Sequence, residues 1–172
     1  PDVGHYKLGL EFWREGRLEE AMSELSRTIA LTPASRDAYL GLAAVAARKT
    51  DWEAALWAYT RCLSQVTPER AAAVHPLIAE LYLEMGNQHL MDGDPAAAIL
   101  YYEQALSYQP SLIHAHVNLG LALAHAGDFD PAFVAFSQAL REAADEQRQT
   151  AVRNGLARAY VALGRHDVEM RR

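Results

Sequence analysis

The sequence has little or nothing of several features that define common functional classes. It holds one cysteine, Cys62, in 172 residues, which excludes an intramolecular disulfide and a cysteine-rich metal site. No apolar run approaches the ~20 residues that a helix needs to cross a bilayer, and no secretory signal peptide is recognisable. Acidic residues outnumber basic residues by 22 to 16, which gives a formal net charge of −6. This balance argues against a general nucleic-acid groove, which would be basic.

The extent of the chain sets a further expectation. It begins at Pro1 rather than at a methionine, so we expect an excised piece or a mature fragment of a longer protein. Such a piece can have lost a targeting segment, and the sequence favours a cytoplasmic location only slightly. The hydrophobic content of 51% is ample for a continuous core in one elongated domain.

A repeat dominates the middle of the chain, where residues 79–112 align with residues 113–146 without a gap. An offset of 34 residues pairs the turn and core positions: Gly86 with Gly120, Gly93 with Gly127, Asp94 with Asp128, Ala98 with Ala132, Tyr102 with Phe136, Ala105 with Ala139 and Leu106 with Leu140. A sustained period of this size indicates an array of helical repeats, in which each unit buries its apolar face only against its neighbours.

The repeated pattern resembles the tetratricopeptide repeat (TPR). It contains a glycine in a first helix, a Gly-Asp turn, an alanine, an aromatic residue, an Ala-Leu pair and a closing proline. The resemblance implies an all-α fold, a right-handed superhelical solenoid of antiparallel helix pairs. It also implies a scaffold that binds other protein chains, without naming the partner.

The TPR register makes residues 1–172 a single array. We expect repeats at about 2–35, 36–69, 79–112 and 113–146, a partial repeat at 150–172, and a helical insert at about 70–78. Pro76 should kink or interrupt that insert, because proline lacks an N–H and clashes with the preceding turn. Thr50 stands where a turn glycine is usual, and Gly164 falls in register with the turn glycines, so a second helix should begin after it.

In TPR proteins the first helix of each pair lines a concave groove, and the resemblance carries this role to the matching positions here. The resulting surface mixes charged, amide and apolar groups, which suits an extended peptide or a partner helix. The expected groove residues are Tyr6, Leu10, Trp13, Arg14, Arg48, Leu83, Glu84, Asn87, Asn118, Leu121, His125 and Arg158.

Asn87 and Asn118 form the most specific pair in this set. TPR domains that grip the C-terminal tail of heat-shock chaperones use asparagines at these positions to hold the peptide backbone and its carboxylate, since an amide donates and accepts at once. The rest of that clamp is missing, because its lysine positions hold Leu83 and Ala151 and its arginine position holds Gly155. We therefore expect no chaperone-tail clamp. The two asparagines either bind a peptide backbone or are ordinary solvated residues.

Two tryptophans have open roles. Trp13 lies near the N-terminal end of the expected groove, where a large amphipathic ring either anchors a ligand or packs against Leu10. Trp57 should face away from the groove on a second helix. There we expect the 70–78 insert to cover it, with a partner site as the alternative.

The sequence gives no sign of catalysis or of a bound cofactor. No nucleophile–base arrangement stands out, and His114 and His116, two residues apart on a helix, point to different sides. We expect no metal, no cofactor, no nucleic acid and no membrane span, and a non-enzymatic scaffold that binds a partner peptide or helix. Two alternatives stay open: a homo-oligomer that associates through the end repeats, and an accessory TPR domain of a larger enzyme.

Overall fold

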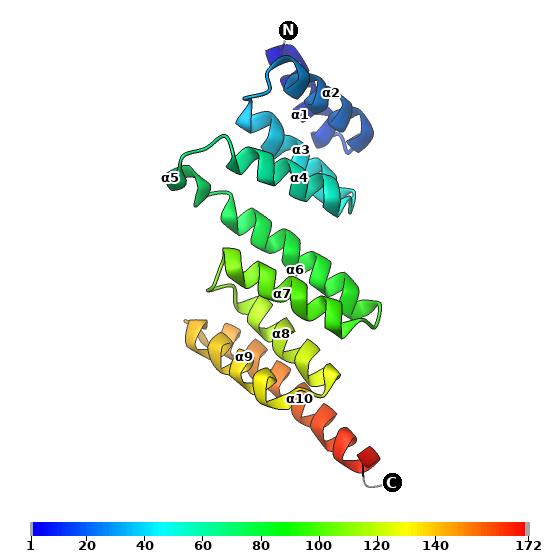
Figure 1. The fold of residues 1–172 in the computed structure, drawn as a ribbon, viewed down its shortest axis with the longest axis vertical. Helices are drawn as coiled ribbons and strands as arrows, with labels where there is room; N and C mark the ends of the chain where they lie inside the picture. The colour runs from blue at the N-terminus through cyan, green and yellow to red at the C-terminus, as the bar shows by residue number, and fades with distance from the viewer. Residues whose placement is uncertain (1, 171–172) are drawn as a thin grey trace. The chain divides into compact units, whose positions relative to one another are not determined.

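The computed structural model describes the backbone of residues 2–170 and the side chains of residues 3–161. The regular structure in that part is α-helical, as predicted, and no described helix is both long and apolar enough to span a membrane. The helices are α1 (Asp2–Arg14), α2 (Leu18–Leu31), α3 (Arg36–Arg48), α4 (Trp52–Leu63), α5 (Pro68–Ala71), α6 (His75–Met91), α7 (Pro95–Tyr108), α8 (Ile113–Ala126), α9 (Phe129–Glu142) and α10 (Glu146–Met170) (Figure 1). The chain divides into two compact units, Pro1–Leu81 and Tyr82–Arg172.

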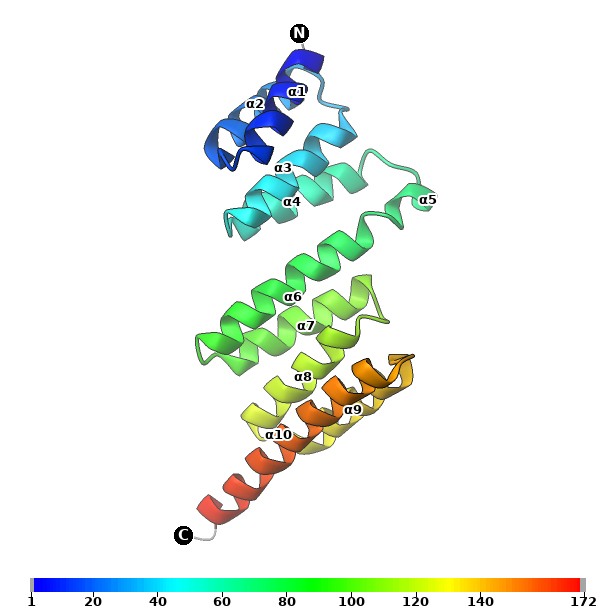
Figure 2. The same cartoon turned by 180° about the vertical axis from the view of Figure 1, so that it is seen from behind.

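The first unit is built from two helix pairs, α1 with α2 and α3 with α4, and α3 also packs against α2 (Figure 2). Leu25 of α2 is fully buried at the point where three of these helices meet. A Cβ placed on Gly9 of α1 would lie 2.9 Å from the Leu25 side chain, and one on Gly41 of α3 would lie 3.2 Å from it. The two glycines therefore allow α1 and α3 to close around one leucine.

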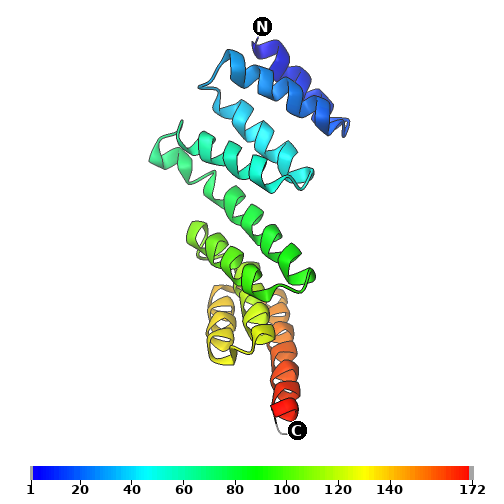
Figure 3. The same cartoon turned by 45° about the vertical axis from the view of Figure 1, so that its right-hand side comes forward.

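The second unit repeats this arrangement around larger side chains. Tyr102 of α7 packs against Gly86 of α6, where an added Cβ would lie 2.5 Å from the tyrosine ring. Phe136 of α9 lies between Gly120 of α8 and Gly155 of α10, where added Cβ atoms would lie 2.8 and 2.9 Å from its ring. The last helix, α10, packs against both α8 and α9 (Figure 3).

The turns inside the helix pairs need an unusual backbone conformation. Gly16, Gly93 and Gly127 have φ values of 78°, 81° and 90°, in the left-handed region that glycine adopts without strain. Thr50 takes the same place before α4 with a φ of 58°. A β-branched residue is strained in this region. The turn before α4 therefore carries backbone strain that the three glycine turns do not.

The insert before the third pair is only partly helical. α5 covers Pro68–Ala71, a turn follows, and α6 begins at His75 with Pro76 in its first turn. A proline is tolerated there because the first N–H groups of a helix have no intrahelical acceptor. Pro76 thus lies at the start of a helix, just after the break that the sequence predicted.

The expected turn at Gly164 is wrong. α10 runs as one helix of 25 residues to Met170. Two residues after the turn position, the earlier second helices have Leu18, Trp52, Pro95 or Phe129, whereas this segment has His166. The apolar residue with which those second helices begin is missing here.

Candidate functional site

The candidate site lies on the first helices of the second unit, α6, α8 and α10, a surface that we call the first-helix face. Here Asn118 of α8 donates a hydrogen bond from Nδ2 to Oδ1 of Asn87 on α6, at 2.7 Å. Tyr102 of α7 donates its hydroxyl to the same oxygen at 3.0 Å. Both asparagines are partly exposed, whereas Tyr102 is fully buried. Two predicted groove residues are therefore joined in one hydrogen-bonded group, the Asn–Asn–Tyr trio, anchored on a core side chain.

The environment keeps the Tyr102 hydroxyl a neutral donor. Burial, followed by the negative charge of Glu84, raises the pKa of Tyr102 to about 12. The proton therefore stays on the hydroxyl well above neutral pH, and a buried donor needs an acceptor. Asn87 Oδ1 supplies that acceptor, and this fixes the direction of the Asn87 amide.

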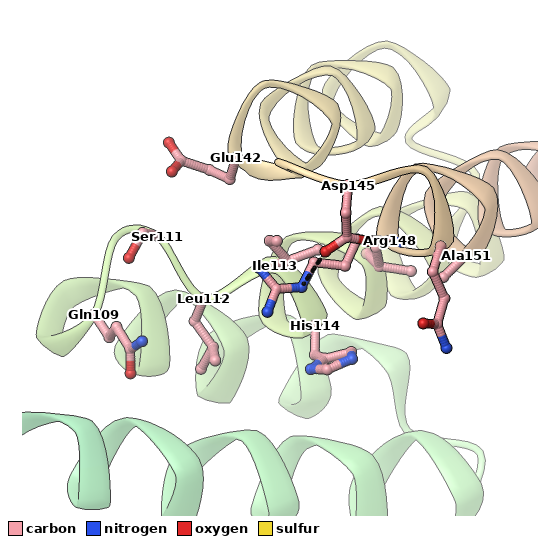
Figure 4. A pocket seen from close by; sticks show the side chains of 11 residues that line it. Gln109, Ser111, Leu112, Ile113, His114, Glu142, Asp145, Arg148 and Ala151 are labelled. Carbon is pink, nitrogen blue, oxygen red and sulfur yellow. Dashed lines mark hydrogen bonds and ion pairs between the residues drawn. The ribbon is translucent and has the colours of Figure 1, made fainter.

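A cleft of about 720 Å³ lies on the same unit, around the N-terminal ends of α8 and α10. Val117, which precedes Asn118 on α8, forms part of its wall, so α8 contributes residues both to the cleft and to the trio. Its wall consists of Gln109, Ser111, Leu112, Ile113, His114, Val117, Glu142, Asp145, Gln147, Arg148 and Ala151 (Figure 4).

The charges of this cleft are already partly paired. Asp145 caps α10, because its Oδ1 accepts the Arg148 backbone N–H at 2.8 Å, and its Oδ2 lies 3.2 Å from Arg148 Nε. Figure 4 shows this pair and His114 at the same opening, while Glu142 points away from it. Sequence reasoning missed Asp145 and Arg148. The available signal was an aspartate directly before a helix, which is typical of a capping residue.

The structure separates the other predicted groove residues of this unit. Leu83 is 7% exposed and belongs to the core. Leu121 packs against the core cluster around Phe136. His125 is exposed and lines a different cleft of about 340 Å³, with Leu90, Gly93 and Pro95. Glu84 and Arg158 are exposed.

The predicted groove residues of the first unit lie on α1 and α3. Tyr6 and Leu10 are half-buried, and burial, followed by the Asp37 carboxylate, raises the pKa of Tyr6. Arg14 and Arg48 are exposed. Trp13 is half-buried, and its indole N–H is enclosed without a hydrogen-bond acceptor among the described residues. This geometry favours the packing role of Trp13 over the anchoring role.

The prediction that the insert covers Trp57 is wrong. Trp57 remains 46% exposed and packs edge-on against Tyr39, with ring centroids 5.7 Å apart. The Arg61 guanidinium lies 5.8 Å from the centre of the Trp57 ring. The ring is therefore supported by α3 and α4 rather than by the insert.

The side chains that the structure describes include no group of three histidine, cysteine, aspartate or glutamate residues arranged to hold a metal ion. Cys62 is buried, and burial raises the pKa of its thiol. A buried thiol with a raised pKa is a poor nucleophile and a poor metal ligand, so Cys62 acts as a small core residue.

The repeat architecture agrees with comparisons to known proteins. The family model described as "Tetratricopeptide repeat" matches residues 6–63 and 83–147. The chain therefore belongs to the tetratricopeptide repeat family. Proteins of this family typically act as scaffolds for protein–protein interaction.

Solved structures show the same fold. A crystal structure of MamA is 26% identical, with a TM-score of 0.55, and the match covers 82% of this chain and 72% of that one. YrrB, described as a TPR protein with an unusual peptide-binding site, is 16% identical, with a TM-score of 0.57, and the match covers 94% of this chain and 77% of that one. Among curated proteins, no sequence matches this chain at a significant level.

Proposed function

We propose that this chain is a non-enzymatic scaffold that binds an extended segment of a partner protein on the first-helix face of its second unit. The observation that carries the proposal is the meeting of Asn87 and Asn118 in a partly exposed, hydrogen-bonded pair. Side-chain amides donate and accept at once, as the main chain of an extended peptide does. A pair of them on adjacent helices can therefore hold a backbone without demanding one particular sequence.

The neighbouring cleft provides a place for side chains of the bound segment. Its volume of about 720 Å³ falls in the usual range for ligand pockets. Leu112, Ile113 and Val117 give it an apolar part, and His114 and Arg148 give it a polar rim. A segment held at the asparagines would place one or two side chains there, so the cleft would supply the sequence preference.

The first unit offers a separate surface for the same kind of partner. Its first helices carry Tyr6, Leu10 and Trp13 together with the exposed guanidinium groups of Arg14 and Arg48. An acidic segment would suit these two cations. We assign this surface a supporting role, because the described side chains of α1 and α3 include no hydrogen-bonded pair comparable to Asn87 and Asn118.

The test is a pull-down from lysate of the source cell with three forms of the chain. The first is the natural sequence, and the second is the Asn87→Ala/Asn118→Ala variant. The third, a matched control, is Glu103→Ala/Gln104→Ala, which changes two exposed residues of α7. A band that is lost only with the asparagine variant supports the proposal, and a band retained by all three forms contradicts it.

Self-association is a second candidate, favoured by apolar exposure on α9 and α10. The rings of Phe133 and Tyr160 pack 5.0 Å apart, and Tyr160 is 59% exposed. Val134 and Val161 are also exposed. A contiguous exposed apolar patch commonly marks an interface, and these side chains are candidates for one. Light scattering over a dilution series tests this candidate: a mass that rises with concentration supports it, and a monomer throughout argues against it.

A further inference from the structure

The last helix, α10, has no second helix packed against it among the residues that the structure describes. In earlier pairs the closest approach falls at Gly9, Gly86 and Gly120, where an added Cβ would lie 2.9, 2.5 and 2.8 Å from side chains of α2, α7 and α9. α10 instead continues as one helix to Met170, so the residues after Gly164 do not fold back on it. Figure 3 shows α10 along the outside of the second unit, with α8 and α9 on one side of it.

Ala157 marks the place on α10 where a second helix would pack. Gly41 of α3 and Gly155 of α10 are equivalent, because each meets a buried side chain of the preceding second helix. Two residues further along, Ala43 of α3 is fully buried, whereas Ala157 of α10 is exposed. The same position is therefore covered by α4 in the earlier pair and is uncovered on α10.

Three other side chains lie on the same side of α10 as Ala157. Arg153 is four residues before it, and Tyr160 and Val161 are three and four residues after it, which is the spacing of one helix face. Tyr160 and Val161 are 59% and 57% exposed, and Arg153 is exposed too. We call these four residues the open face of α10. It is separate from the side through which Val152 joins the core around Phe136.

The position of Arg153 contacts the second helix in earlier pairs. His5 of α1 stands at this position, and its Nδ1 lies 2.5 Å from Oε2 of Glu24 on α2. Tyr82 of α6 stands there as well, and its ring stacks on Tyr101 of α7 with centroids 6.3 Å apart. A helix that packed on the open face would therefore place a side chain beside the Arg153 guanidinium.

Arg153 sets the charge that such a side chain should carry. Its guanidinium makes no ion pair with another described residue. In the first pair, the carboxylate that meets His5 belongs to Glu24, directly before Leu25, which packs against Gly9. An acidic residue directly before the large apolar residue of a bound helix would meet Arg153 in the same way, as a charge-assisted hydrogen bond.

We propose that the open face of α10 binds a helix of a partner protein, which packs on Ala157 as a second helix packs on its own first helix. This helix carries an alanine, a large apolar residue four positions later, as Ala21 and Leu25 do in α2, and an acidic residue directly before the large one. The surface is distinct from the pair of asparagines, so this inference does not depend on the proposed function.

The charge of Arg153 favours a different protein over a second copy of this chain. From Gln147 to Val161, α10 contains no acidic residue, so a second α10 would bring no carboxylate to Arg153 from this stretch. The second helices α2, α4 and α9 are already packed against their own first helices. A second copy is therefore treated as a contrary outcome of the test.

The probe is a synthetic peptide with the sequence of residues 17–32, acetylated, amidated and labelled with fluorescein. It carries Ala21, Glu24 and Leu25 at the required spacing. Fluorescence anisotropy gives its Kd for the natural chain and for Arg153→Gln, and the same for a Glu24→Gln form of the peptide. We expect the peptide change to weaken binding to the natural chain about fivefold, and binding to Arg153→Gln by less than about twofold.

A second variant tests where the peptide binds. Ala157→Arg places a long side chain in the centre of the open face, and it should weaken binding at least about tenfold by obstructing the helix. Ala126→Arg is the matched control, because Ala126 is the exposed last residue of α8, where a cation is favourable. It should bind the peptide as the natural chain does. Circular dichroism verifies that both variants are folded.

Several results would overturn the proposal. These are no binding up to about 1 mM of the chain, equal affinities of Ala157→Arg and the natural chain, or the same loss from the peptide change on natural and Arg153→Gln proteins. In ¹⁵N spectra, shifts at Gly9 and Gly41 rather than at Ala157 would show that the peptide displaces α2. Light scattering that finds a dimer of the natural chain and a monomer of Ala157→Arg would assign the open face to a second copy.

Discussion

The Phe136 ring occupies the space beside Gly120 so closely that a Cβ on this glycine would lie 2.8 Å from two of the ring carbons. Phe136 is fully buried, and Gly155 of α10 approaches it at a similar distance. The ring is thus held between two helices and has little room to shift. This contact fixes how closely α8 and α9 approach, and hence where α8 carries Asn118.

A methyl group at Gly120 should therefore destabilise the chain. Gly120→Ala is expected to lower the free energy of unfolding by about 1–3 kcal/mol, as overpacking does in other cores, and Gly120→Leu by more. Urea denaturation followed by circular dichroism measures the change. Gly4→Ala is the matched control, since a Cβ there meets nothing within 4 Å and should be neutral or slightly stabilising. Equal stability of Gly120→Leu and the natural chain would refute the packing.

Thr50 offers a stabilising change. Its φ of 58° strains a β-branched residue, so Thr50→Gly should raise the free energy of unfolding by about 1 kcal/mol. The hydroxyl bond from Thr50 to the Lys49 carbonyl is exposed, and its loss should subtract little. The reciprocal change, Gly93→Thr, should destabilise by a similar amount. A fall in stability for Thr50→Gly would show that this turn carries no strain.

The sequence predicted the helical repeat well because its signals are periodic. Gly120 and Phe136 were assigned to packing positions from a 34-residue offset, and the structure places them in contact. Thr50 was recognised as unusual for the same reason. The turn predicted at Gly164 does not form, because register alone does not make a turn. The segment after it has His166 where the earlier second helices begin with an apolar residue.

The candidate site was harder to predict because its polar contacts are not periodic. Asn87 and Asn118 were singled out, but their mutual bond depends on the relative placement of α6 and α8. The repeat pattern specifies only an aromatic residue at position 102, so it does not predict a role for the Tyr102 hydroxyl. Arg148 lies where the register slips by three residues, so no family position pointed to it.

The direction of the bond between the asparagines predicts unequal effects of two isosteric changes. Asn118→Asp replaces the donor to Asn87 Oδ1 with a second acceptor, so it should destabilise the ligand-free chain by about 1–3 kcal/mol. Asn87→Asp keeps both incoming hydrogen bonds, and its added cost is the repulsion between its carboxylate and that of Glu84, so it should destabilise the chain less than Asn118→Asp does. Thermal and urea denaturation of the two variants compare them directly. Equal losses, or a larger loss for Asn87→Asp, would contradict the assigned direction.

Alkaline pH should weaken the fold through Tyr102. Its pKa is raised to about 12 from a value near 10, so below pH 10 both the folded and unfolded chains hold the proton. Between pH 10 and 12 the unfolded chain loses that proton first, so the free energy of unfolding falls as pH rises. Tyr102→Phe should make this fall shallower, whereas the exposed control Tyr160→Phe should not. Identical slopes for all three proteins would contradict the burial of the hydroxyl.

A buried alanine provides a test of the third helix pair. Ala98 of α7 is fully buried, so Ala98→Asp places an unpaired charge in the core and should cost more than about 3 kcal/mol. Ala96→Asp, on an exposed position in the first turn of the same helix, should be tolerated, because an acid is favourable there. Circular dichroism at 25 °C distinguishes them. A folded Ala98→Asp protein with natural stability would show that α7 does not pack as described.

The central claim, that the first-helix face of the second unit binds a peptide, is tested most directly by an NMR titration. A peptide selected by phage display on the immobilised chain would be added to ¹⁵N-labelled protein, and the shifted resonances mapped onto the structure. We predict that the largest shifts fall on Asn87, Val117, Asn118 and Ala151. Shifts centred on Trp57, or on Phe133 and Tyr160, with these four residues unchanged, would contradict the claim.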